Sequence, residues 1–360
     1  MRLSIEQHHL QQLLSRVIGA VGKRTTIPIL GNVLLSATNT LQATTTDLDM
    51  QITAQADAQV TAPGETTVNA TLLTGIVAKL PKGSLVNLDL KDEILHVQAG
   101  RSKFKLSTLP VEDFPVMASN EYKSRLEFQG LELQAALKKT VWAASTETTR
   151  YYLNGVAMQH RDGKANFIAT DGHRLAWFTD GYVDEFPNVI IPNEAVKQFI
   201  GALDEGESVL EVSETKIRLT HNDTVIVTKT IGGTFPEWSR VLPANIPNKV
   251  TLPSVAAKEA IERVSIVASE KTKVVKLSVA DSEIKFYVRD QVMGDATEVI
   301  EAQQDGDGVE IGLNGRYALD AFAQADKGEV TVHYGGGMDT VKVTYDKEEG
   351  LVVVVMPVRI

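Results

Sequence analysis

The sequence predicts an α+β protein of three similar domains, each made of two helices and short antiparallel strands. Two observations support this fold class: helical segments recur at a constant interval, and alternating, strand-like segments follow them. The length of 360 residues agrees, because single hydrophobic cores stop growing at roughly 250–300 residues.

The helical segments come in two sets of three. The first set has apolar residues at helical spacing, in LQQLLSRVIGAVGKR at Leu10–Arg24, LQAALKKTVWAASTETTR at Leu133–Arg150 and VAAKEAIERVSIVASEKTK at Val255–Lys273. The second set lies at Asn69–Pro81, Pro192–Leu203 and Asn314–Ala325. Each set recurs at intervals of 123 and 122 residues, an agreement that two unrelated sets would rarely show.

Strand-like segments follow each second helix and are separated by turn residues. The turns are expected at Lys91-Asp92, Asn222-Asp223 and Gly335–Gly337. Linkers are expected near Ala118–Tyr122 and in the proline-containing Pro243–Lys249. We therefore expect domains at residues 1–120, 121–246 and 247–360.

The net charge of −10 has the wrong sign for a protein that binds nucleic acid by bulk charge. The charge is unevenly placed, however: the helical windows sum to +4, which leaves −14 on the strands and loops. Relatively basic helices could face a polyanion while the other surfaces repel it. The alternative is that the helices simply carry more lysine, without a functional reason.

Composition excludes several classes of protein. No apolar segment approaches the ~20 residues of a membrane-spanning helix, the longest being Leu351–Val358, and the start MRLSIEQHHL lacks the apolar core of a signal peptide. The absence of cysteine excludes disulfides, thiolate catalysis and cysteine-ligated zinc. We expect a cytoplasmic protein without a membrane partner.

Catalytic and metal-binding patterns are weak. In TDGHRL, Asp171 could orient His173 as a general base, but no G-x-S-x-G motif supplies a nucleophile. The histidines show no H-E-x-x-H spacing. Gly335–Gly337 is not followed by the Lys-Ser/Thr of a phosphate-binding loop. We expect no catalytic residue, no metal and no cofactor.

Seven strings, in order along the chain, closely resemble the bacterial β sliding clamp, the processivity subunit of the replicative polymerase (DNA polymerase III). They are PILGN at Pro28–Asn32, TDLDM at Thr46–Met50, STLPVEDFP at Ser107–Pro115, RYYLNG at Arg150–Gly155, ATDGHRLA at Ala169–Ala176, FPEWSRVLP at Phe235–Pro243 and MPVRI at Met356–Ile360. The resemblance extends over essentially the whole chain.

This resemblance implies a non-enzymatic DNA clamp fold, in which two helices pack on antiparallel sheets in each domain. Two chains would form a closed six-domain ring, a homodimer that encircles duplex DNA without sequence preference. The implied partners are the polymerase III alpha subunit, the clamp loader, and other polymerases and repair proteins that bind through short linear motifs.

The resemblance also implies three sets of site residues. The DNA-facing set is Arg24, Arg150, Tyr151 and Tyr152. The partner-peptide groove is Leu153, Thr170, Gly172, His173, Leu175, Pro236, Val241, Val354 and Met356, flanked by Arg150, Arg174 and Arg240, with a shallower site at Asn314, Tyr317, Pro357, Val358 and Arg359. The dimer interface would join Phe104 and Leu106 on a first-domain strand to Ile266 and Val267 on a third-domain helix.

Three residues depart from the family pattern: Glu147 replaces an uncharged polar residue, and Val358 and Ile360 replace Met and Leu. The departure at Glu147 bears on the DNA-facing loop, and the other two bear on motif preference. Two alternatives to the clamp remain on the sequence alone: a hydrolase that uses His173, and a repeat scaffold that never contacts DNA.

Overall fold

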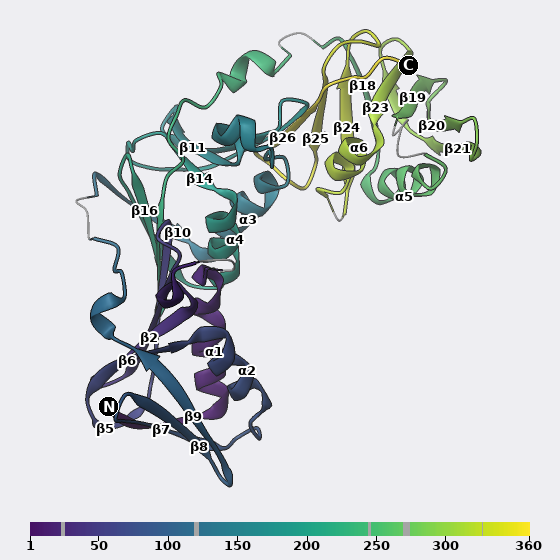
Figure 1. Cartoon of the computed structure of the whole chain (residues 1–360). Helices are drawn as coiled ribbons and strands as arrows, with labels where there is room; N and C mark the ends of the chain where they lie inside the picture. The colour runs from purple at the N-terminus through teal and green to yellow at the C-terminus, as the bar shows by residue number, and fades with distance from the viewer. Residues whose placement is uncertain (23–25, 119–121, 244–245, 269–273, 326) are drawn as a thin grey trace. The chain divides into compact units, whose positions relative to one another are not determined.

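The computed structural model describes residues 1–22, 26–118, 122–243, 246–268, 274–325 and 327–360 (Figure 1). It contains two compact units, which are described separately. The first comprises Met1–Gln134, Glu185–Pro187 and Glu194–Thr230, and the second Ala135–Asp184, Asn188–Asn193 and Ile231–Ile360. Within the described ranges, no helix is both long and apolar enough to cross a membrane.

The first unit is one large antiparallel sheet with helices. Its helices are α1 (Gln7–Val17), α2 (Ala70–Lys79) and α4 (Asn193–Ala202). In sheet order its strands are β10 (Ser124–Gln129), β15 (Glu207–Val212), β16 (Lys216–His221), β17 (Thr224–Lys229), β4 (Met50–Ala56), β3 (Leu41–Thr46), β2 (Asn32–Ala37), β6 (Gly64–Asn69), β9 (Ser102–Leu109), β8 (Ile94–Ala99), β7 (Leu85–Lys91), β1 (Arg2–Glu6) and β5 (Gln59–Ala62).

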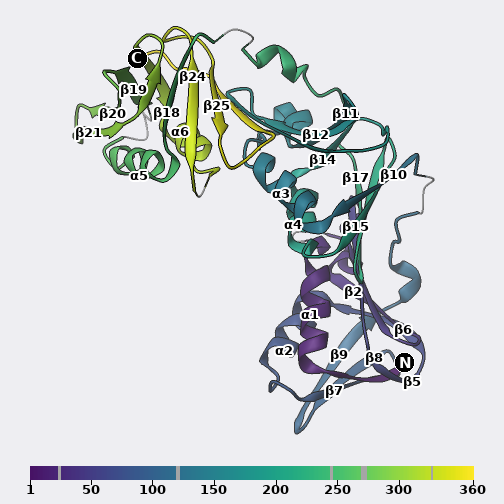
Figure 2. The same ribbon diagram turned by 180° about the vertical axis from the view of Figure 1, so that it is seen from behind.

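Helices α1 and α2 lie side by side on this sheet (Figures 1 and 2). Helix α1 buries Leu10, Leu13, Leu14 and Val17, which recur at three- and four-residue spacing and so form one apolar stripe. Helix α2 begins at a side-chain cap, because Asn69 Oδ1 accepts the N–H of Leu72 at 2.8 Å.

The second unit has two sheets. Its helices are α3 (Gly130–Val141, from residue 135 onward), α5 (Ser254–Ser265) and α6 (Gly315–Phe322). The nine-stranded sheet runs in the order β14 (Val189–Pro192), β11 (Gly155–Arg161), β12 (Lys164–Thr170), β13 (Arg174–Tyr182), β26 (Leu351–Val355), β25 (Val341–Tyr345), β24 (Glu329–Tyr334), β18 (Asn248–Pro253) and β22 (Gln303–Asp305). The four-stranded sheet is β21 (Gly294–Glu301), β20 (Glu283–Asp290), β19 (Val274–Ala280) and β23 (Val309–Asn314).

Each large sheet continues from one sequence repeat into the next. In the first unit, β17 of the second repeat pairs with β4 of the first, from Thr224 opposite Ala54 to Thr228 opposite Met50. In the second unit, β26 of the third repeat pairs with β13 of the second, from Arg174 opposite Val355 to Phe178 opposite Leu351. Both junctions are antiparallel, and the predicted α+β class with antiparallel sheets is confirmed.

All six predicted helices are present, but the first helix of each repeat ends earlier than predicted. Helices α1, α3 and α5 end at Val17, Val141 and Ser265. The following N–H groups bond to carbonyls three residues back, as in Ala143 to Thr140 and Ile266 to Arg263, so the α-helical ladder stops. The apolar pattern continues because residues such as Ala20 and Ala143 still pack in the core. The ends of two predicted segments, Arg24 and residues 269–273, lie outside the described residues, as do parts of both expected linkers.

The structure predicts that the stability of the second unit depends strongly on Phe322, whose side chain packs α6 into the core. Phe322 is 1% exposed, and its ring meets that of Phe286 edge-on at 6.1 Å. Phe322→Ala should lower the free energy of unfolding by about 3–5 kcal/mol through the cavity it leaves. Calorimetry or urea denaturation measures this, and Val292→Ala, at a side chain 90% exposed, is the control. Equal stability of the two variants would contradict this packing.

Candidate functional site

The turn between β12 and β13 in the second unit is held by its own side chains. Thr170 Oγ1 donates to the carbonyl of Arg174 at 2.6 Å and accepts the N–H of Gly172 at 3.0 Å. Asp171 Oδ1 accepts the N–H groups of His173 and Arg174 at 2.9 and 3.0 Å. Gly172 has a φ of +89°, which favours glycine. The turn therefore presents His173, which is exposed, in one conformation.

Arg174 is buried beneath this turn, with 8% of its side chain exposed. Its Nε donates to Asp171 Oδ2 at 3.1 Å, Nη1 to Asp320 Oδ2, and Nη2 to the carbonyl of Trp142 at 2.9 Å. The guanidinium also lies 4.6 Å from the ring centroid of Tyr317. Arg174, which was predicted to flank the groove, is therefore a buried link between the turn and α6, and its charge is already matched.

Helix α6 supplies the neighbouring polar groups. Asn314 caps the helix by accepting the N–H groups of Arg316 and Tyr317 at 3.0 and 3.3 Å. The Tyr317 ring stacks on that of His173, with centroids 6.2 Å apart and planes inclined by 19°. Burial raises the pKa of the Tyr317 phenol, and the Asp171 carboxylate raises it further. The phenol is therefore a neutral hydrogen-bond donor near pH 7.

The end of the chain is fixed against the same turn. The N–H of Met356 donates to the carbonyl of His173 at 2.8 Å, and the N–H of Val358 donates to that of Gly312 at 2.8 Å. The first bond extends the β13–β26 junction past the last residue of β26, and the second attaches Val358 to β23. Residues 356–358 are thus part of the folded unit.

An apolar cluster lies under this region. Its buried members are Leu153, Ala157, Ile168, Leu175, Ile190, Phe235, Trp238 and Val354, and Val241 packs against it. Leu153, Leu175 and Val354 are 3% exposed or less. The accessible residues of the predicted groove are instead Gly172, His173, Pro236, Val241 and Met356, which we call the His173 patch. The structure thus brings most of the predicted groove residues to one unit.

The remaining groove residues are at the edge of this region. Arg240 and Arg359 are exposed, whereas Pro357 and Val358 are partly buried. Arg150 is 33% exposed and lies in the 3₁₀ segment Thr148–Leu153. Tyr151 is 55% exposed, and its ring meets that of Tyr152 edge-on at 5.8 Å.

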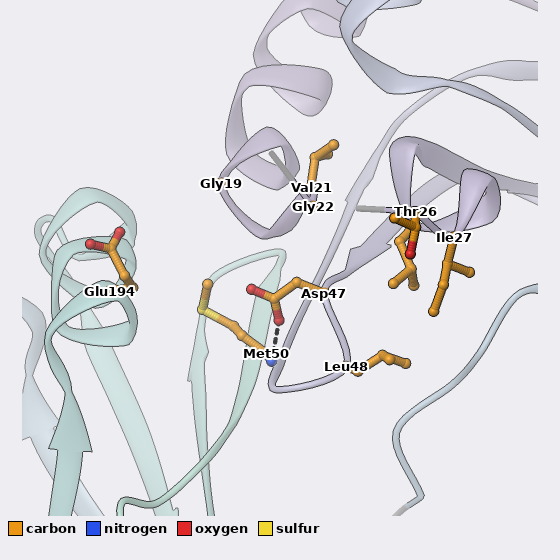
Figure 3. Close-up of a pocket in the computed structure, with 10 residues that line it drawn as sticks. Gly19, Val21, Gly22, Thr26, Ile27, Asp47, Leu48, Met50 and Glu194 are labelled. Carbon is orange, nitrogen blue, oxygen red and sulfur yellow. Dashed lines mark hydrogen bonds between the residues drawn. The ribbon is translucent and has the colours of Figure 1, made fainter. Parts of the chain in front are cut away.

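Arg24 lies outside the described residues, but its neighbours Gly22 and Thr26 line a cavity of about 670 Å³ in the first unit (Figure 3). Its wall combines apolar side chains such as Leu30 and Met50 with polar groups, among them the carboxylates of Asp47 and Glu194. Asp47 Oδ1 accepts the N–H of Met50 at 2.7 Å, which fixes the turn at this cavity.

The four predicted interface residues lie on β9 and directly after α5. Phe104 and Leu106 are on β9, where Phe104 is partly exposed and Leu106 is 6% exposed. Ile266 and Val267 directly follow α5, and Ile266 is its C-cap with φ −60° and ψ −32°, so the two residues lie at the end of the predicted helix and not within it. Ile266 is 78% exposed, because the helix ends before it and its side chain leaves the core.

Neither arrangement that resembles a catalytic site is suited to chemistry. The Asp171 carboxylate bonds to backbone N–H groups and Arg174, while the His173 ring stacks on Tyr317. A serine, histidine and aspartate chain that we did not predict occurs in the first unit: Ser208 Oγ and Asp204 Oδ1 each lie 2.7 Å from a ring nitrogen of His221. Ser208 is fully buried and His221 is 2% exposed, so no substrate reaches them.

The sequence analysis also did not predict one group of potential metal ligands. Glu6, His8 and His9 place one ligand atom each within 4.8 Å of one another, at the first turn of α1. All three side chains are exposed. The partial positive charge of a helix N-terminus opposes a cation there, and we assign no metal to this group.

Comparison with known proteins identifies relatives along the whole chain. Family models for the DNA polymerase III beta subunit match in three parts: the N-terminal domain at residues 1–118, the central domain at 127–237 and the C-terminal domain at 239–359. The beta sliding clamp of Caulobacter vibrioides is 38% identical over 373 residues, and that of Escherichia coli K12 is 32% identical over 368 residues. Each alignment covers 100% of both chains.

Solved structures of related proteins match this chain over its full length. A sliding clamp from Bartonella birtlesii, bound to griselimycin, is 33% identical and superposes with a TM-score of 0.96. The Caulobacter crescentus polymerase III beta subunit is 37% identical, with a TM-score of 0.93. Both comparisons cover 100% of each chain.

The burial of Arg174 generates a prediction about stability. Arg174→Ala leaves the carboxylates of Asp171 and Asp320 without their shared cation, and should cost about 3 kcal/mol of folding free energy. Urea denaturation at pH 7 measures the loss. Arg289→Ala removes an arginine whose side chain is 75% exposed and should change stability by less than about 0.5 kcal/mol. Similar values for both variants would show that Arg174 does not hold the turn to α6.

Proposed function

Because the chain belongs to the DNA polymerase III beta subunit family, the bacterial sliding clamps, we propose that two copies close head to tail into a ring around duplex DNA. The protein has the three-domain clamp fold and is a processivity factor without chemistry of its own. We place the domains at residues 1–120, 121–246 and 247–360, and the protein in the cytoplasm.

The junctions between repeats support the ring. By their order in the repeats, β4, β13 and β21 are equivalent strands, and so are β17, β26 and β9. Two of the three possible junctions, β4 with β17 and β13 with β26, occur within the chain. The third would join β21 to β9, and each of these strands has an open edge: β21 is the last strand of its sheet, and β9 pairs with β6 only at Thr108 and Leu109. Pairing β21 of one copy with β9 of another completes the series.

The charges of these edges are complementary. Strand β9 exposes Lys103 and Lys105, whereas β21 exposes Asp295 and Glu301. Opposite charges on facing strands favour this pairing and oppose pairing of either edge with itself. The contact joins two different surfaces and closes after two copies, with Phe104 and Leu106 of one chain near Ile266 and Val267 of the other.

A closed ring explains how an acidic protein retains DNA. Linkage keeps the duplex inside even when each phosphate contact is weak, and weak contacts permit sliding. We propose that Arg24, Arg150, Tyr151 and Tyr152 contact the DNA. Bound proteins would then stay on the template for as long as the ring stays closed.

We further propose that the His173 patch binds short linear motifs of the polymerase III alpha subunit, the clamp loader, and other polymerases and repair proteins. Burying one Leu or Phe of a partner is worth about 1.5–3 kcal/mol, which suits partners that exchange. Met356 is an adaptable contact for varied side chains. The buried Leu153, Leu175 and Val354 would form its floor, Thr170 and Arg174 its support, and Arg150 and Arg240 its edge. Asn314, Tyr317, Pro357, Val358 and Arg359 would extend it.

Loading onto circular DNA tests the ring. With a compatible clamp loader, the protein should remain on a nicked circular plasmid during gel filtration and be lost when a restriction enzyme linearises the plasmid. Lys103→Glu with Lys105→Glu should give a monomer by light scattering and no retention, because like charges then meet at the interface. Equal retention on circular and linear DNA would show binding by affinity, and no retention on either would favour a scaffold that does not meet DNA.

Deletion of Met356–Ile360 tests the partner site. The truncated protein should remain a dimer by light scattering, because the deletion leaves both proposed interface strands intact. Stimulation of polymerase synthesis should fall to the level measured without the clamp. Tyr182→Ala, at an aromatic residue 83% exposed outside the patch, should preserve stimulation. Unaltered stimulation by the truncated protein would refute the partner-site assignment.

A further inference from the structure

The loop before β11 contains an ion pair that connects the proposed DNA-facing and partner-facing residues. Glu147 Oε2 accepts hydrogen bonds from Arg150 Nε at 3.0 Å and Arg150 Nη2 at 2.8 Å. Glu147 is held in turn, because its N–H donates to Ser145 Oγ at 3.1 Å. Arg150 has φ −110° and ψ 52°, which interrupts the 3₁₀ segment at this residue.

The pair also fixes the far edge of the guanidinium. A Cβ on Gly172 would lie 2.7 Å from Arg150 Nη1, so the guanidinium rests directly on the backbone of this glycine. Nη1 has two N–H groups that the pair with Glu147 does not use. They lie beside Gly172, a member of the His173 patch, and are placed to meet a carbonyl or carboxylate of a bound segment.

The same pair changes what the loop offers to DNA. Glu147 is 58% exposed and Arg150 33%, so a phosphate in solution can approach both side chains. A phosphate that approaches Arg150 has to compete with a carboxylate already bonded to it, and it is repelled by that carboxylate. The pair is exposed to water, so its effect on either ligand is a modest factor.

We propose that Glu147 is a positioning residue that orients Arg150 toward partner binding and weakens, without abolishing, the contact of Arg150 with DNA. Glu147 orients Arg150 so that Nη1 faces the His173 patch. The partner group it would meet is a carboxylate or carbonyl of a short apolar peptide. This inference rests on the proposed function and concerns how Arg150 is shared between DNA contact and partner binding.

Glu147→Gln tests the proposal in the full-length dimer with two probes. The first is a fluorescein-labelled pentapeptide with two leucines, a phenylalanine and a free C-terminal carboxylate; the second is a labelled 30-base-pair duplex. Fluorescence anisotropy should show peptide affinity about threefold lower. Duplex affinity at low salt should be about threefold higher, with the slope of log K against log salt steeper by about 0.9, because one more cation meets phosphate.

Two comparisons separate positioning from general effects. Glu214→Gln removes the same charge from an exposed pair with Lys123 in the first unit and should leave both affinities unchanged. In an Arg150→Gln background, Glu147→Gln should have no further effect on peptide affinity, because Glu147 acts through Arg150.

The outcomes are distinct. If Glu147→Gln and Glu214→Gln behave alike, or if Glu147→Gln weakens peptide binding equally without Arg150, the positioning role is wrong. These results leave the ring intact as a proposal when the wild-type protein is retained on circular DNA. Failure of wild-type retention and of wild-type peptide binding would instead overturn the proposed function itself.

Discussion

Antiparallel pairing between strands of different repeats is the constraint on which the rest of this structure depends. A strand edge leaves main-chain N–H and C=O groups unpaired, and it invites association with another chain. The chain satisfies two such pairs of edges internally, at β4 with β17 and at β13 with β26. The edges of β21 and β9 remain open. A single chain therefore leaves the edges of β21 and β9 unpaired, and the proposed ring would pair them in the same antiparallel way that already joins its repeats.

The candidate partner site is a consequence of one of these junctions. Because β26 pairs with β13, the chain beyond Val355 is carried to the turn at His173, where the N–H of Met356 finds its acceptor. Arg174 then connects this turn to Asp320 on α6, 146 residues away in sequence. Buried ion pairs of this kind contribute little net stability, but they strongly disfavour arrangements in which one partner is lost. Their effect here is to hold segments of two repeats in one arrangement.

Much of the fold could be predicted because the helices repeat their apolar spacing at a constant interval. The ends of these helices could not be predicted, since the same apolar pattern continues through turns such as Ile18–Ala20, where Ala20 still packs in the core. The site was harder. Strings such as TDGHR locate the turn, but nothing in them shows that Arg174 is buried or that Asp320 is its partner. The chain of Ser208, His221 and Asp204 was invisible for the same reason, because it forms only when the end of α4 meets β15 and β16.

The distribution of charge fits the proposed retention of DNA by linkage. A protein that depends on affinity has to gather cations against phosphate, and each contact then has to break before the protein moves along the duplex. A ring is free of that requirement, so the acidic strands and loops need only avoid the inner surface. The proposed role of the Glu147–Arg150 pair extends this logic to a single loop: a carboxylate beside a potential phosphate contact would weaken that contact and would keep the arginine in place for a protein partner. Weak binding to DNA and a fixed docking surface would thereby be compatible within one loop.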